Sequence, residues 1–214
     1  APIADPASDG WSVCRDLLAA GLIEVANPEA PRAEWTIRLP QTVWQMIRGE
    51  SPGELMPGCR LVAADAFPAL DDLSGDPELI ARLGRVPGLM EDGRVRILVI
   101  KGMPGSDQLQ VIGAVARGLG CGLAVVQGGA ATPVAAADGA ARGPLGPVCI
   151  MGRYLPVFTY DLAPGETAEA PRIPGYDGPI AISLGLEGGV GGVAGETSLA
   201  LTLPPRDGDE RRLC

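Results

Sequence analysis

The sequence predicts an α/β fold: a largely parallel sheet with flanking helices, preceded by a small α+β unit at the N-terminus. Two observations carry this prediction. From Arg94 onward, apolar strand-like runs alternate with stretches of helical periodicity, which implies crossover connections and a sheet covered on both faces. Before residue 51, two helix-like stretches enclose two short strand-like runs.

Residues 1–50 form the first predicted unit. Residues 11–20 carry apolar side chains at helical spacing, the strand-like runs 22–25 and 35–39 can pair as a hairpin, and residues 41–48 are typical of a second helix. Helix, hairpin and helix in this order predict a winged-helix-like module.

The core and partner of this module follow from its apolar and charged residues. We expect Leu17, Leu22, Val43 and Ile47 to form its core. The chain has a net charge of −9 and a pI near 4.5, which opposes binding to a phosphate backbone. We therefore expect this unit to dock a protein and not a nucleic acid.

The remaining chain divides into a connector and an α/β domain. Residues 51–93 contain turn clusters and a short helix at 77–83, which predicts a connector. Residues 94–214 form the α/β domain, whose strands we expect at 95–100, 123–126, 157–162, 180–186 and 199–203, with helices at 107–119 and 147–151.

Composition excludes several kinds of chemistry. The sequence has no histidine, which removes Ser-His-Asp catalysis, His-ligated metals and an imidazole base. Its five cysteines contain no CxxC pair and are typical of a reduced, intracellular chain. Because neither a signal segment nor an unbroken membrane-length apolar stretch is visible, we expect a cytoplasmic protein without membrane contacts.

The sharpest local motif is a strand that runs into a glycine-rich turn and then a helix. This is the setting of a phosphate loop, in which backbone N–H groups and a helix N-terminus hold phosphates. The predicted loop comprises Gly102, Met103, Pro104, Gly105, Ser106, Asp107 and Gln108.

The loop lacks the residues that phosphate chemistry requires. A working loop ends in Gly-Lys-Ser/Thr, with the lysine on the β/γ-phosphates and the hydroxyl on Mg²⁺. Counted from Gly102, those three positions hold Asp107, Gln108 and Leu109, and Lys101 precedes the loop. We expect the loop shape to persist without phosphate binding, and the Asp107 carboxylate to cap the following helix in place of a phosphate.

The chain resembles the N-terminal half of bacterial AAA+ ATPases of the type encoded near contractile injection systems. Those proteins place a winged-helix-like region and a degenerate AAA module before an intact AAA+ module. The matching stretches are residues 17–22, 96–106, 155–158, 164–167, 185–189 and 201–207.

The resemblance implies roles for further positions. The Walker B segment would be residues 157–162, where Asp161 fits the metal position but Leu162 replaces the glutamate that activates water. The sensor strand would be residues 180–186, and neither Asn nor Thr ends it. Residues 94–214 would then be a large AAA subdomain. Its helical lid would follow Arg211-Arg212, so we expect a piece of a longer protein.

Two competing motifs fail on their context. Residues 189–194 match GxGxxA, but strand-like residues follow where a dinucleotide fold needs a helix. Residues 181–185 form an imperfect nucleophile elbow around Ser183, and no histidine exists to take its proton. We expect Ser183 to be an ordinary strand residue.

Together with these observations, the resemblance implies a non-catalytic interaction and scaffold region of a larger AAA+ ATPase. No cofactor is expected for this chain, whereas ATP and Mg²⁺ would act in the parent protein. The expected partners are a protein and the other subunits of the parent ring. Two alternatives stay open: a nucleotide-binding ATPase module with an unusual Walker A loop, and a free-standing protein-binding domain.

Overall fold

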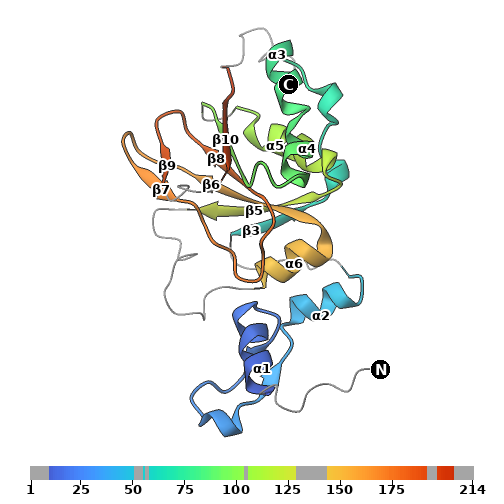
Figure 1. Ribbon diagram of the computed structural model, residues 1–214, viewed down its shortest axis with the longest axis vertical. Coiled ribbons are helices and arrows are strands. Elements are labelled where there is room, and N and C mark those ends of the chain that lie inside the picture. Colours follow the sequence, from blue (N-terminus) through green and yellow to red (C-terminus); the bar gives the residue numbers. More distant parts are fainter. Residues whose placement is uncertain are drawn as a thin grey trace.

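The computed structural model describes residues 10–50, 55, 58–103, 106–128, 144–191 and 197–204. Its largest feature is a mixed α/β body, and the N-terminal helices α1 and α2 lie at one end of the molecule, with α3 at the other (Figure 1). The N-terminal elements are α1 (Gly10–Ala19), β1 (Glu24–Val25), η1 (Arg32–Glu34), β2 (Ile37–Arg38) and α2 (Gln41–Ile47). Next come β3 (Cys59–Val62), η2 (Ala64–Ala66), η3 (Leu70–Asp72), α3 (Pro77–Leu83), α4 (Val86–Glu91), β4 (Ile97–Lys101) and α5 (Gln108–Gly118). The last are β5 (Gly122–Gly128), α6 (Leu145–Gly152), β6 (Tyr154–Tyr160), β7 (Thr167–Glu169), β8 (Ile180–Leu184), β9 (Gly189–Gly191) and β10 (Ser198–Thr202).

Six of the described strands form one sheet in the order β10-β4-β8-β6-β5-β3. Every neighbouring pair is parallel except β3, which lies antiparallel to β5 at one edge. The predicted largely parallel sheet with flanking helices is confirmed. The short strands β7 and β9 form a separate parallel pair. β7 lies in the connection after β6, and β9 lies in the connection after β8.

The sheet has an apolar core on each face, because successive strand residues point to opposite sides. One face packs against α3, α4 and α5, and we call it the α5 face; Leu98, Val125 and Val157 lie on it. The other face packs against α6 and the β7–β9 pair, and Val126 and Phe158 lie there. Gly113 permits the close packing of α5, since a Cβ there would lie 2.1 Å from the ring of Phe67.

The stretch predicted as a connector contributes directly to the α/β body. β3 supplies an edge strand of the sheet, and α3 and α4 pack on the α5 face. α3 covers the predicted residues and begins with Asp76 as N-cap, whose carboxylate accepts the N–H of Glu78 at 3.0 Å. Pro77 in the first turn was the local signal that predicted this helix, and the structure adds Asp76 as its cap.

The N-terminal unit has the predicted order of helix, hairpin and helix. β1 and β2 pair antiparallel, with Glu24 opposite Arg38. Its core is smaller than expected: Val43 is fully buried, Leu17 and Leu22 are half-buried, and α1 has no buried residue. The expectation for Ile47 is wrong, because 58% of this residue is exposed. The helical periodicity correctly indicated an apolar face on α2, but among the described residues only the part around Val43 is packed against other side chains.

Candidate functional site

The loop after β4 lies at a topological switch point of the sheet. The connection that leaves β4 crosses the α5 face, where Val111 and Ile112 of α5 are buried. The connection that leaves the neighbouring strand β8 runs over the opposite face, where Val190 of β9 packs. Crevices between two such carboxyl ends are the usual ligand sites of open α/β sheets. The sequence-predicted loop is therefore at the position where a ligand would bind.

Gln108 fills this switch point with its own side chain. Its Nε2 donates to the carbonyl oxygen of Leu184 at 2.6 Å, and its Oε1 accepts the hydroxyl of Ser183 at 2.8 Å. Both partners end β8, 75 or more residues away in the sequence. We call these two bonds the Gln108 lock.

The lock requires glycine at position 102, because the Gln108 side chain leaves no room there for a Cβ atom. A Cβ on Gly102 would lie 2.3 Å from Ser106 Oγ and 2.9 Å from Gln108 Nε2. The backbone N–H of Gly102 also donates to the Leu184 carbonyl at 3.2 Å. This carbonyl therefore accepts two hydrogen bonds, one from Gly102 after β4 and one from Gln108 of α5. Ser106 Oγ is buried and has no hydrogen-bond partner among the described residues.

The predicted role of Asp107 is not what the structure shows. Asp107 occupies the N-cap position of α5, but its side chain makes no capping hydrogen bond. The residue that ties the helix start to the sheet is the next one, Gln108. Met103 is 44% exposed beside the loop, while Pro104 and Gly105 lie outside the described residues.

The Lys101 side chain lies on the face of the sheet opposite the α5 face. Its Nζ donates to the carbonyl of Gly188 at 2.8 Å, in the connection that leaves β8. A Cβ on Gly188 would lie 3.0 Å from Leu162, so the residue at the expected water-activating position packs against this same connection. The ammonium therefore holds a backbone carbonyl instead of reaching toward the loop.

Of the remaining predicted positions, Asp161 and the GxGxxA match lie apart from the lock, whereas Ser183 belongs to it. Asp161 follows β6 and is exposed. Ser183 is an interior strand residue, as expected, and is 5% exposed. Gly189 to Gly191 form β9, and residues 192–194 of the GxGxxA match lie outside the described residues. Sequence reasoning missed Ser183 as the partner of Gln108; the available signal was a polar residue in an otherwise apolar strand.

Magnesium nucleotide does not fit the residues at this switch point. A working loop presents a lysine ammonium to the phosphates, whereas Gln108 is neutral and both ends of its amide are already bonded to β8. Within the described ranges, no group of three or more Cys, Asp or Glu side chains is placed to hold a metal ion.

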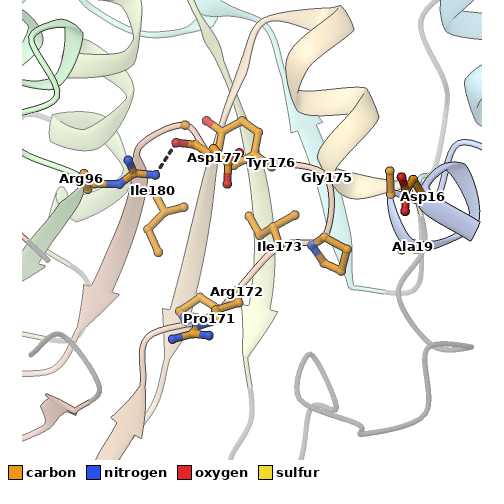
Figure 2. Close-up of a pocket in the computed structure, with 13 residues that line it drawn as sticks. Asp16, Ala19, Arg96, Pro171, Arg172, Ile173, Gly175, Tyr176, Asp177 and Ile180 are labelled. Atoms are coloured by element: carbon orange, nitrogen blue, oxygen red, sulfur yellow. Dashed lines mark hydrogen bonds between the residues drawn. The ribbon is translucent and has the colours of Figure 1, made fainter. Parts of the chain in front are cut away.

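A hollow of about 680 Å³ lies at the other end of β4 and β8, away from the Gln108 lock. Figure 2 shows its wall, the loop of residues 171–178, between α1 and the start of β4, where the Arg96 guanidinium donates to the carbonyl of Asp177. Its lining mixes apolar Ile173 and Ile180 with Arg96, Arg172 and Asp16. Burial raises the pKa of the Tyr176 hydroxyl, which donates to the Pro179 carbonyl at 2.9 Å and stays neutral. This lining combines apolar contacts with charged side chains of both signs.

No protein-family model matches this sequence, and no curated protein matches it. Among the described helices, none is long and apolar enough to cross a membrane.

Proposed function

We propose that this chain is a non-catalytic interaction and scaffold region of a larger AAA+ ATPase, in which the former phosphate loop serves as a structural lock. The Gln108 lock carries this proposal. A side chain of the protein occupies the switch point and ties the start of α5 to β8, at the position where a working loop would hold a phosphate.

The strand order supports the AAA part of the proposal. Numbered along the chain, the five parallel strands of the sheet lie in the order fifth, first, fourth, third, second. The resemblance to AAA modules implies a phosphate loop after the first strand of such a parallel sheet. β4 is the first strand here, and the Gln108 lock follows it.

Exposed apolar side chains support the interaction role. Of the nine large apolar side chains exposed in the described part of the chain, five belong to residues 10–50. They are Val13, Ile37, Leu39, Trp44 and Ile47. Such exposure on a small unit favours docking to a protein, and the hollow beside α1 adds a recess for a segment of that partner.

The nucleotide part is tested by thermal unfolding with and without ATP-Mg²⁺. A working site at 100 times its Kd would add about 2.7 kcal/mol of stability, which is several degrees in Tm for a chain of this size. We expect no shift for the wild-type chain and no ATP hydrolysis. The triple variant Asp107→Gly, Gln108→Lys, Leu109→Thr should gain a small shift but no turnover, because Leu162 remains.

A magnesium-dependent shift of the wild-type chain, or turnover that survives further purification, would instead establish the nucleotide-binding alternative.

The docking part is tested separately with a photo-crosslinking residue in the full-length parent protein. Position 44 on α2 should crosslink to a partner, and position 82 on α3, at the far end of the molecule (Figure 1), should not. Equal crosslinking from both positions contradicts a docking surface on the N-terminal unit.

A further inference from the structure

A row of polar side chains crosses the carboxyl end of the sheet on the α5 face. Gln127 of β5 pairs in register with Thr159 of β6, and Thr159 pairs with Ser183 of β8. Each follows, two residues on, a buried apolar residue of the α5 face. Because side chains alternate along a strand, all three polar residues lie on that face as well.

The row divides into two parts with different partners. Ser183 belongs to the Gln108 lock. Thr159 lies nearer the β3 edge, and its hydroxyl makes one long hydrogen bond, 3.3 Å, to the carbonyl of Val126. The Gln127 side chain is exposed and makes no hydrogen bond with the described residues. Two polar groups of the row are thus available to a ligand.

These two groups line a hollow of about 390 Å³ beside the edge strand β3. Leu109 of α5 and Val125 of β5 give it apolar walls, and Arg60 of β3 lines it too. Arg60 pairs in register with Val125, which places it on the α5 face. The hollow is therefore separate from the lock, which joins β4, β8 and α5.

The charge of this hollow opposes the charge of the chain. The whole sequence carries −9, yet the described residues that line the hollow include Arg60 and no Asp or Glu. No described carboxylate forms a salt bridge with Arg60. Cys59 pairs in register with Val126, and its side chain packs in the core on the other face of the sheet, so its thiol adds no charge to the hollow. Within the described part of the chain, the positive charge of Arg60 is therefore uncompensated.

We propose that this hollow binds a small molecule that carries an oxyanion, a carboxylate or a phosphate, next to an apolar group. The guanidinium of Arg60 pairs with the oxyanion in the planar, two-pronged geometry that arginine favours. The amide of Gln127 and the hydroxyl of Thr159 donate to the same oxygens, the hydroxyl by giving up its long bond to Val126. Leu109 and Val125 contact the apolar group.

The dimensions and location agree with such a ligand. Cavities of about 150 Å³ already hold a benzene ring, so 390 Å³ accepts a ring with its charged group. The carboxyl ends of parallel strands are also where open α/β sheets bind ligands. The site makes no use of the phosphate loop and holds whether or not the parent protein is an ATPase.

The test is calorimetric titration of the whole chain with benzoate, phenyl phosphate and neutral benzamide. We expect saturable one-to-one binding of at least one anion and none of benzamide. The preferred anion then identifies the ligand as a carboxylate or a phosphate. Arg60→Gln should weaken binding about tenfold or more, as expected for a lost charge-assisted contact. Gln127→Glu, which adds a negative charge, should do the same.

Arg82→Gln, on exposed α3, is the matched control and should bind as the wild type does. Urea unfolding of each variant confirms that the exposed substitutions leave the fold intact. Three results would overturn the proposed site: neither anion binds saturably, Arg60→Gln retains wild-type affinity, or benzamide binds as tightly as the anions.

Discussion

Replacing Gln108 by Ala removes both hydrogen bonds that join the start of α5 to β8. The Leu184 carbonyl keeps one donor, the N–H of Gly102 at 3.2 Å. The Ser183 hydroxyl, in a residue only 5% exposed, loses its acceptor and has little access to water. Since a typical hydrogen bond contributes about 0.5–1.5 kcal/mol net, Gln108→Ala should lower the free energy of unfolding by about 1–3 kcal/mol.

Urea unfolding followed by circular dichroism measures this loss, and Gln110→Ala is the matched control. Gln110 lies two residues along the same helix and is exposed, so its replacement gives the same gain in helix propensity without losing the lock. The difference between the two variants isolates the two hydrogen bonds. A double-mutant cycle with Ser183→Ala should show a coupling of about 0.5 kcal/mol or more between Gln108 and Ser183. Equal stability of the two glutamine variants would refute the assignment of a structural role to Gln108.

Two further predictions concern packing and thiol chemistry. Gly113→Ala should cost on the order of 1–3 kcal/mol, because its Cβ would lie 2.1 Å from the Phe67 ring; Gly88→Ala, with no atom within 4 Å of its Cβ, should be neutral or stabilising in the same urea assay. Cys59 and Cys149 should react with iodoacetamide at pH 8 far more slowly in the native chain than in urea, because burial raises both thiol pKa values above the ordinary 9.0. Equal native and unfolded rates, read by mass spectrometry, would contradict their burial.

Short-range signals made several elements predictable. Pro77 near the first turn indicated α3, and the apolar run before Gly102 indicated β4. β3 was not predicted, because its four residues, Cys59 to Val62, become a strand through pairing with β5, about 60 residues later in the sequence. Turn residues on its N-terminal side gave the stronger local signal.

At the candidate site, too, local signals predicted the elements, whereas contacts between residues distant in the sequence were not predictable. Local rules placed the strand and the start of the helix within about two residues, and they favoured Asp107 as the residue that would satisfy the empty loop. The partners of Gln108 lie on β8, and only the assembled sheet brings them within hydrogen-bonding distance. Likewise, the apolar stripe that includes Ile47 was visible in the sequence, but periodicity does not reveal whether a partner element covers it.

The contact between Gly175 and Ala20 has a mechanical consequence. A Cβ on Gly175 would lie 2.9 Å from that of Ala20, so the loop of residues 171–178 lies directly against the residue after α1. This loop leads into β8 and receives the Arg96 side chain from the residue before β4, while the far ends of these two strands meet at Gln108. Each strand has five residues and spans about 16 Å. β4 and β8 thus form a continuous hydrogen-bonded connection, one end of which is joined to the loop that contacts Ala20 and the other to the start of α5.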